Sequence, residues 1–269
     1  MDKSHEEELL EMAVNNEINP LQDNDTFVVG CKQCGKCCRN RNDIILNPFD
    51  VFHIAQATGK TLPEVINKYG EAYIGESSCL PLVLLKYRED SFGTGTTCYF
   101  LGKKDDKYYC RINDKKPFVC KTYPLERLTV FEKMENVDAF EPIYHTQVHY
   151  KEYDCIGIEE AMQTNENHTV LEWVGGKEKK EMADAFWRIY TKFLYDLDNI
   201  VDLHSFVEHK DQTLVESVMN HFFKKYYLDY DPNGTEEEFL QQYKSNTENI
   251  LHMFQKLVQM LPQYAKAEK

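Results

Sequence analysis

Apolar residues recur at three- and four-residue steps through most of the second half of the chain, which is the pattern of amphipathic helices. The stretches that carry this pattern are 177–201, 211–230 and 235–261. The Asp-Pro-Asn-Gly sequence between the last two predicts a turn. In the first stretch the apolar stripe is Met182, Phe186, Ile189, Tyr190, Phe193, Leu194 and Leu197. Glu236–Glu238 suit the N-terminal dipole of the third helix, so we expect them to open a helix and not to bind a metal.

Two shorter helices, joined as a hairpin, are predicted in the first half of the chain. Asn47 is a good N-cap, Pro48 suits the first helical position, and Gly59 suits the helix exit. In the second helix, Thr61 and Glu64 have the spacing of a capping box. That helix is predicted within 61–74, with an apolar stripe of Leu62, Val65, Ile66 and Tyr69.

Residues 79–150 show a third pattern, of short runs rich in β-branched and aromatic residues between Gly, Asp and Lys turns. These runs predict a few short strands and much irregular backbone, to which metal ligation could supply the missing order. The predicted fold class is therefore mainly α (α+β). An irregular cysteine-rich segment with short strands would pack on a helical C-terminal half.

Composition and charge narrow the class of protein. The chain has 269 residues and a formal net charge of −14. Binding to duplex nucleic acid and polybasic membrane anchoring both rest on Lys and Arg, so we expect neither nucleic acid nor membrane as a partner. The acidic start lacks the apolar core of a signal peptide, and no stretch approaches the roughly 18 apolar residues of a membrane span. We therefore expect a cytoplasmic protein.

Nine cysteines carry the clearest chemical signal. An odd count without a secretion signal disfavours a disulfide framework, and a reducing cytosol favours metal ligands. The predicted ligands are Cys31, Cys34, Cys37, Cys38, Cys98, Cys110, Cys120 and Cys155. Two-residue gaps in the first four let thiolates converge from a tight turn, where Gly35 permits a positive φ or a close backbone approach. Cys79 falls outside these spacings and is expected to lie apart as a small buried hydrophobe.

The adjacent pair Cys37-Cys38 predicts a division of roles. Neighbouring side chains on extended backbone point to opposite sides, so two adjacent thiolates rarely serve one mononuclear site. One is expected to bind the main centre. The other would reach a second metal or stay a free thiol, with its pKa lowered by the cations Lys36 and Arg39.

The spacing leaves two kinds of metal centre open. Zinc favours four tetrahedral ligands, and eight thiolates could hold two such sites. Closely spaced cysteines with remote ones are common around iron–sulfur clusters, so we favour iron–sulfur, such as 4Fe-4S, over zinc. His145 and His149, on a predicted strand, are second-choice ligands. His53 is expected to be a packed or surface residue, and Tyr123 to pack over the cluster.

The cysteine blocks taken together resemble a known family. The blocks that carry the resemblance are Cys31-Lys-Gln-Cys34-Gly-Lys-Cys37-Cys38, Cys98-Tyr-Phe-Leu, Cys110-Arg-Ile, Lys116-Pro117-Phe-Val-Cys120-Lys-Thr-Tyr123-Pro124 and Cys155-Ile-Gly157-Ile158. They resemble the CxxCxxCC cysteine-cluster family (YkgJ-like), a domain described as zinc- or iron-chelating, and the cluster domain of flagellin lysine N-methylases is similar. The resemblance covers about residues 31–158 and implies a bound metal or iron–sulfur centre.

Three classes of function follow as expectations. The first is a metal-cluster protein with a structural or redox-active centre and a protein partner. The second, implied by the methylase relatives, is an S-adenosylmethionine-dependent protein lysine N-methyltransferase with a protein substrate. No Gly-rich nucleotide loop followed by an acidic residue supports the cofactor of that class, and no catalytic residue is assigned. The third is a zinc-chelating or metal-handling protein.

The same observations predict three segments. They are an acidic lead-in at 1–30, a cysteine-cluster metal-binding domain at 31–158, and a helical region at 159–269 that packs with the cluster domain as one unit. Within the lead-in, Glu6–Val14 has the composition of a short helix, but a solvated or frayed terminus is favoured.

Overall fold

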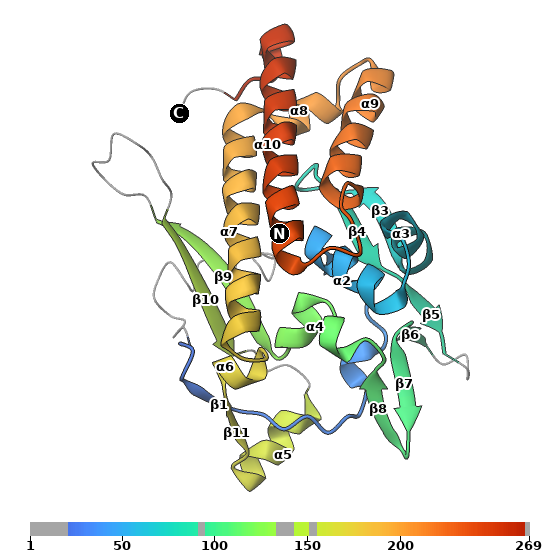
Figure 1. Cartoon of the computed structure of the whole chain (residues 1–269), viewed down its shortest axis with the longest axis vertical. Coiled ribbons are helices and arrows are strands. Elements are labelled where there is room, and N and C mark those ends of the chain that lie inside the picture. Colours follow the sequence, from blue (N-terminus) through green and yellow to red (C-terminus); the bar gives the residue numbers. More distant parts are fainter. Residues whose placement is uncertain (1–20, 91–94, 133–142, 151–154, 267–269) are drawn as a thin grey trace, which may run out of the picture. The chain divides into compact units, whose positions relative to one another are not determined.

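In the computed structural model (Figure 1), the described residues are 21–90, 95–132, 143–150 and 155–266. The short helix considered at Glu6–Val14 lies outside them. Helices dominate from residue 156 onward, and short strands in small sheets occupy much of 70–132. The fold class is therefore mainly α with an α+β cysteine-rich part, as predicted. None of the helices in the described ranges combines the length and the apolar character needed to cross a bilayer.

The chain forms two compact units whose segments alternate along the sequence. The first unit consists of Met1–Lys32 and Lys121–Glu181, and the second of Gln33–Cys120 and Met182–Lys269. Each unit contains parts of the predicted cysteine domain and parts of the predicted helical region.

The first unit is small and is built around two antiparallel strand pairs, β1 with β11 and β9 with β10. Its elements are β1 (Thr26–Val28), β9 (Leu125–Glu132), β10 (Ile143–Tyr150), α5 (Ile156–Thr164), β11 (Asn167–Thr169) and α6 (Val170–Trp173). Its core consists of Phe27, Val29, Leu125, Ile158, Val170 and Val174. The strand β11 was not predicted, because Asn-His-Thr is polar and its place is set by pairing with β1.

Helices supply most of the second unit. They are α2 (Pro48–Thr58), α3 (Leu62–Tyr69), α4 (Phe118–Thr122), α7 (Lys177–Ile200), α8 (Leu203–Val207), α9 (Gln212–Phe223) and α10 (Glu236–Met260), with single turns at Lys36–Cys38, Asn113–Lys115 and Pro262–Tyr264. Both α4 and α7 continue into the first unit. Helices α7 and α10 run side by side (Figure 1), and the rings of Phe186 on α7 and Tyr243 on α10 pack with their centroids 5.0 Å apart. The predicted stripe on α7 is confirmed, since Phe186, Phe193 and Leu197 are buried.

The predicted caps of α2 and α3 are confirmed. The side chain of Asn47 accepts a hydrogen bond from Asp50 N, Pro48 begins the helix, and Gly59 ends it at φ +62°. Thr61 and Glu64 form the second capping box.

The second of these helices is shorter than predicted. It ends at Tyr69, and Gly70–Ile74 form the strand β3 instead. A Cβ on Gly70 would lie 2.6 Å from Val83 Cγ1, so only glycine lets the chain pack this closely on β4 (Pro81–Leu85) as it leaves the helix.

Helix α9 gives way to a π-helical turn, Lys224–Leu228, where a continuous helix was predicted. The wider turn buries two consecutive tyrosines, Tyr226 and Tyr227. Tyr227 donates to Leu46 O at 3.0 Å, and Tyr226 lies 3.4 Å from the hydroxyl of Tyr243. The helical periodicity of the sequence does not indicate that two adjacent tyrosines are both buried.

Short strands complete the second unit. They are β2 (Ile45–Leu46), β3 and β4 in one sheet of order β2-β4-β3, then β5 (Tyr87–Glu89) with β6 (Thr96–Cys98), and β7 (Leu101–Lys104) with β8 (Lys107–Cys110). All these pairs are antiparallel. The β-rich runs predicted over 79–150 are therefore strands, and those of the second unit carry two of the predicted cysteine ligands.

Candidate metal centre

The first cysteine segment turns tightly and packs on β8. Gly35 has φ +71°, as predicted, and leads into the single 3-10 turn at Lys36–Cys38. A Cβ on Gly35 would lie 3.0 Å from Tyr108 Cβ, so the close approach requires glycine. Tyr108 N donates to Gln33 O at 2.8 Å. Cys34, Cys37 and Cys38 are thereby held beside the strand that carries Cys110.

The exit of this segment is bonded to β6, which carries Cys98. Asn40 N donates to Thr96 O at 2.9 Å, and Thr96 N donates to Asn40 Oδ1 at 2.8 Å. Arg39 forms a β-bridge with Thr97. Three contacts within two residues of Cys38 therefore fix its distance from Cys98.

Backbone amides point at two of the sulfurs. Phe100 N donates to Cys98 Sγ at 3.4 Å, and the amide hydrogen bond from Ile112 lowers the pKa of Cys110 against the stronger effect of burial. Arg111 N donates to Phe100 O at 2.8 Å and ties the two cysteine-bearing hairpins together. Amide donors aimed at sulfur stabilise thiolates, which are the metal-binding form of cysteine.

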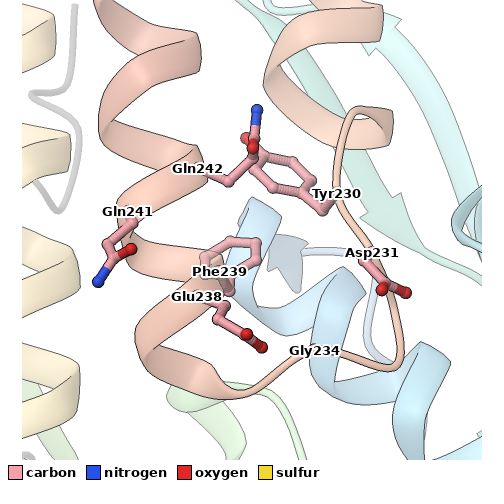
Figure 2. Close-up of a pocket in the computed structure, with 7 residues that line it drawn as sticks. All are labelled: Tyr230, Asp231, Gly234, Glu238, Phe239, Gln241 and Gln242. Carbon is pink, nitrogen blue, oxygen red and sulfur yellow. The ribbon is translucent and has the colours of Figure 1, made fainter.

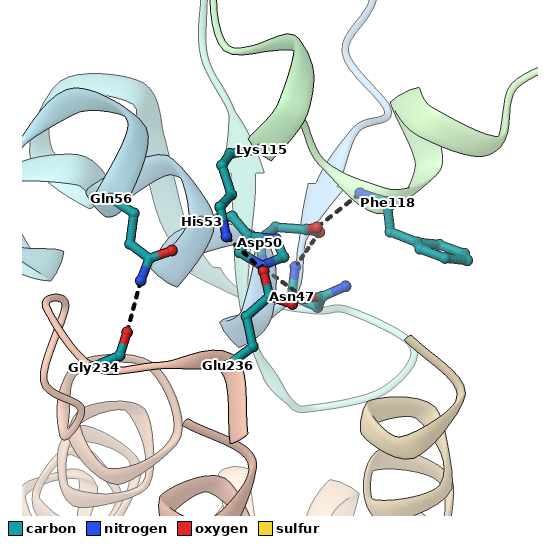
Figure 3. Close-up of polar contacts among 8 residues, drawn as sticks. All are labelled: Asn47, Asp50, His53, Gln56, Lys115, Phe118, Gly234 and Glu236. Atoms are coloured by element: carbon teal, nitrogen blue, oxygen red, sulfur yellow. Dashed lines mark hydrogen bonds and ion pairs between the residues drawn. The ribbon is translucent and has the colours of Figure 1, made fainter. Parts of the chain in front are cut away.

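The buried carboxylate of Asp50 helps to position the helix that carries Cys120, as Figure 3 shows. Asp50 is 3% exposed and accepts hydrogen bonds from Asn47 N at 3.1 Å and from Phe118 N at 2.8 Å. Phe118 begins α4, which carries Cys120. Burial raises the pKa of Asp50 to about 7, and the two amide donors oppose that rise. Asp50 thus links the start of α2 to the start of the cysteine helix.

A second polar group on α2 faces α10. Glu236 Oε1 lies 2.9 Å from His53 Nε2 and 2.5 Å from Lys115 Nζ (Figure 3). The hydrogen bond with His53, followed by that with Lys115, lowers the pKa of Glu236 to about 2. The expectation for His53 is confirmed, since it is a packed residue 4.1 Å from the ring of Phe49.

Five predicted ligands lie close enough to shift one another's pKa. The hydrogen bond with Cys37 raises the pKa of Cys38 most, followed by burial and by the charges of Cys37, Cys98 and Cys120. Burial raises the pKa of Cys120 most, and the charge of Cys98 follows. Burial also raises that of Cys98, with a contribution from Cys110. We call Cys37, Cys38, Cys98, Cys110 and Cys120 the five-cysteine cluster.

The adjacent pair within the cluster is closer than expected. Cys37 Sγ and Cys38 Sγ are 3.9 Å apart, because both lie in the 3-10 turn and not on extended backbone. The hydrogen bond from Cys38 lowers the pKa of Cys37 to about 6, with burial opposing and Lys116 and Arg41 assisting. The contact therefore favours the thiolate at Cys37 and the thiol at Cys38.

The cations beside Cys37 differ from those predicted. Lys116 and Arg41 lower its pKa, in place of Lys36 and Arg39. The guanidinium of Arg39 instead lies 4.7 Å above the ring of Tyr108. Lys116 lies between the turn Asn113–Lys115 and α4, and the fold brings it near Cys37. The spacing of residues in the sequence could not indicate this.

The remaining predicted ligands are Cys34, Cys31 and Cys155. Cys34 is half-buried in the second unit. Cys31 and Cys155 belong to the first unit, where Gly30 N donates to Gly157 O at 3.1 Å and brings their neighbouring segments together. Cys155 precedes α5 and packs against the small core. The convergence of all eight cysteines stays a prediction.

Cys79 occupies a different environment. It is buried at φ +54° in the turn before β4, with Sγ 3.3 Å from His204 Nδ1. Burial raises its pKa, and Asp202 and Glu208 raise it further, which makes it a protonated thiol. Its hydrogen bond ties the turn to α8.

The other candidates add little. His145 and His149 lie on β10, a strand as predicted, but their side chains are outside the described residues. Tyr123 precedes Pro124 through a cis peptide bond, and Tyr123 O accepts from Trp173 Nε1 at 3.1 Å. Sequence reasoning missed Asp50, because its position beside the start of α4 depends on a contact 68 residues along the chain.

Thiol chemistry fits a metal centre here, although no three His, Cys, Asp or Glu side chains in the described ranges are arranged as ligands of one ion. The residues suit a metal because several sulfurs lie near one another, backbone amides donate to two of them, and cations lie nearby. Metal binding would have to draw the thiolates to about 2.3 Å from the ion.

A separate hollow lies at the N-terminal end of α10, and Figure 2 shows its lining. Its volume is about 400 Å³, and it is lined by Tyr230, Asp231, Gly234, Glu238, Phe239, Gln241 and Gln242. Glu238 already accepts from Thr235 N at 2.7 Å in the helix cap. Since no cysteine or histidine lines it, this hollow is not part of the candidate thiolate metal centre.

Comparison with known proteins identified a family. A family model described as "CxxCxxCC: Putative zinc- or iron-chelating domain" matches residues 30–167, just over half of the chain. No curated protein and no solved structure matched the chain. The matched range contains every cysteine of the chain.

Proposed function

Because the chain belongs to this CxxCxxCC family, we propose that the five-cysteine cluster is the heart of a thiolate-bound metal centre. The family description supports metal binding by zinc or iron. The observation that carries the proposal is the gathering of thiols from the first cysteine segment, from β6, from β8 and from α4. These thiols come from four separate elements of the fold, which is the arrangement that a shared metal would join.

The charges around the cluster suit bound thiolates. Lys116 and Arg41 act on Cys37, and Lys116 and Arg111 act on Cys110. Each of these cations lowers the pKa of its thiol and would offset the negative charge of a metal–thiolate centre. Without a metal, burial opposes ionisation of Cys98, Cys110 and Cys120, so metal binding would release protons.

We take an iron–sulfur centre as the first form of this proposal. Its support is the sequence spacing, with cysteines clustered in one segment and others placed far along the chain. Zinc is a second form, and one distance favours it. The 3.9 Å between the sulfurs of Cys37 and Cys38 is close to the edge of about 3.8 Å of a tetrahedron with metal–sulfur bonds of about 2.3 Å.

The role of the centre in this proposal is structural or redox, with a protein partner. A strongly acidic chain of net charge −14 favours a partner with a basic face. Lysine methylation with S-adenosylmethionine, implied by the methylase resemblance alone, is not part of this proposal.

Anaerobic purification with metal and acid-labile sulfide analysis tests the two forms. An iron–sulfur protein should be brown, with iron and sulfide in equal amounts. A colourless protein with stoichiometric zinc would support the second form. Protein that takes up neither iron nor zinc would reject the proposal.

The variants Cys37→Ser and Cys38→Ser test the division of roles within the adjacent pair. Cys38 is half-buried and lies near enough to Cys98 and Cys120 for their charges to raise its pKa, whereas Cys37 is exposed. We expect Cys38→Ser to abolish metal loading and Cys37→Ser to leave most of the metal bound. Equal and complete loss in both would reject the division of roles and show that both cysteines bind the metal, in a polynuclear centre or as one edge of a zinc tetrahedron.

A further inference from the structure

Tyr87 lies directly opposite Cys98 in the β5–β6 pair. Directly opposed residues of antiparallel strands leave the ladder on the same face, with Cβ atoms about 4.5–5.5 Å apart. The ring of Tyr87 therefore leaves its strand on the side to which Cys98 presents its sulfur. The following residues of the strand, Arg88 and Glu89, are exposed, whereas Tyr87 is half-buried and packs against the large core.

The surroundings of the Tyr87 hydroxyl are those of the cluster. Burial raises its pKa most, and the charges of three cluster thiols, Cys98, Cys120 and Cys38, raise it further. Arg41, which also acts on Cys37, opposes them. The phenol is therefore protonated and close to sulfur atoms contributed by three separate segments.

The hydroxyl is an unused donor. Within the described part of the chain it forms no hydrogen bond to another residue, so it is free to donate one. The thiols of Cys98, Cys120 and Cys38 act on this hydroxyl, and their sulfurs become strong acceptors once they are thiolates. Backbone amides already serve Cys98 and Cys110 in this way.

We propose that Tyr87 is a positioning residue of the metal centre, which donates an O–H···S hydrogen bond to a metal-bound thiolate of the five-cysteine cluster. This inference rests on the proposed metal centre. The hydrogen bond would orient the sulfur and withdraw electron density from it, as outer groups do around other metal ligands. Tyrosine suits this place because its ring fills the edge of the core while its hydroxyl reaches the sulfurs.

Tyr87→Phe isolates the hydroxyl, since it keeps the ring and its packing. Tyr109→Phe is the matched control, because Tyr109 neighbours Cys110 on β8 but is 45% exposed and faces solvent. The full-length protein would be stripped of metal and titrated anaerobically with Co²⁺, which reports thiolate ligation through sulfur-to-cobalt charge-transfer bands. Chelator competition would give the affinity.

We expect Tyr87→Phe to weaken Co²⁺ binding about tenfold, the lower end of the range for outer-group substitutions. We also expect its charge-transfer bands to move to lower energy, because sulfur lone pairs lose the stabilisation of the hydrogen bond. Tyr109→Phe should change neither.

Three results would overturn the inference. They are wild-type spectra and affinity in Tyr87→Phe, equal changes in Tyr109→Phe, and weaker binding with unmoved bands, which would show a packing role alone. Wild-type protein that binds no Co²⁺ through sulfur, and that also takes up neither iron nor zinc, would instead remove the metal centre itself, and with it this role.

Discussion

Two regions of the second unit are held together by different forces. In the helical core, rings such as Phe222, Tyr243 and Phe254 are fully buried and touch other rings. In the cysteine region, from 33 to 40 and from 96 to 120, the hairpins are short and the thiols are mostly half-buried. Burial of apolar rings stabilises the helical core whether or not a metal is bound. Bringing several thiols together stabilises the second region only if a ligand binds them.

This difference explains why the cysteine region needs its hydrogen bonds. The contacts Asn40–Thr96, Gln33–Tyr108 and Asp50–Phe118 each join a cysteine-bearing element to its neighbour. They hold the thiols near one another but supply little apolar burial. We therefore expect the core to fold without metal and the cysteine region to be completed by it.

Metal removal should have the largest effect and fall on the cysteine region alone. Apparent binding free energies of structural zinc in small domains reach about 10–16 kcal/mol, so a region held by metal loses most of its stability without it. Hydrogen exchange of the apo protein should show early loss of protection around 31–41 and 99–123, while α7 and α10 stay protected. Equal protection in apo and loaded protein would show that the centre is not structural.

Phe254→Ala should instead destabilise the helical core and not the cysteine region. Phe254 is 0% exposed and packs on Phe206 and Phe222, so its truncation leaves a cavity that costs about 3–5 kcal/mol. Urea unfolding should show this loss with or without metal. Met260→Ala on the same helix is the control, because Met260 is 72% exposed and its loss should cost less than about 0.5 kcal/mol. A metal-dependent loss in Phe254→Ala would contradict the separation of the two regions.

The two regions also differ in what their sequences predict. The stripe on α7 and the caps of α2 and α3 follow from local periodicity and spacing, and the structure confirms them. The π-helical turn at Lys224–Leu228 and the strand β3 do not, because tertiary packing overrides local preference there.

In the cysteine region, the sequence predicts that cysteines gather, but it does not predict which other residues lie beside them. The cysteine spacing pointed to a cluster, and the structure gathers five of its members. Asp50, Lys116 and Tyr87 could not be predicted, since each reaches the cluster through a contact set by the fold.

Asp50→Asn tests the link between the regions. An amide accepts through one atom only, so it would leave one of the amides of Asn47 and Phe118 facing a donor, at a cost of about 1–3 kcal/mol. Measured near pH 8, above the pKa of about 7, unfolding should show that loss and metal affinity should fall with it. Asp114→Asn, in the exposed turn before α4, should change neither. Unchanged metal affinity in Asp50→Asn would show that α4 is placed without this carboxylate.

Glu236→Gln should have the smallest effect on the free energy of unfolding, and that effect should appear at acidic pH. The pKa of Glu236 is lowered to about 2 by His53 and Lys115, from an unfolded value of about 4.3. A lowered carboxyl pKa contributes stability above the unfolded value and loses it as the pH falls toward 2. After solvent screening we expect about 1–2 kcal/mol. Urea unfolding at pH 5 and at pH 2.5 should show this loss in the wild type, and Glu236→Gln should flatten it.

Glu237→Gln, on the exposed side of the same turn, is the control for that experiment. It should keep the acid sensitivity of the wild type. An unaltered pH dependence in Glu236→Gln would mean that the contact between α2 and α10 does not contribute to stability.

The most direct test of the five-cysteine cluster is the metal content of Cys120→Ser beside that of Cys79→Ser. Both variants replace one thiol of the second unit, but Cys120 faces other cluster cysteines and Cys79 faces His204. After anaerobic purification, we predict that Cys120→Ser retains little metal and that Cys79→Ser retains the wild-type amount per chain. Wild-type metal in Cys120→Ser, or its loss in Cys79→Ser, would contradict the assignment of the centre to this cluster.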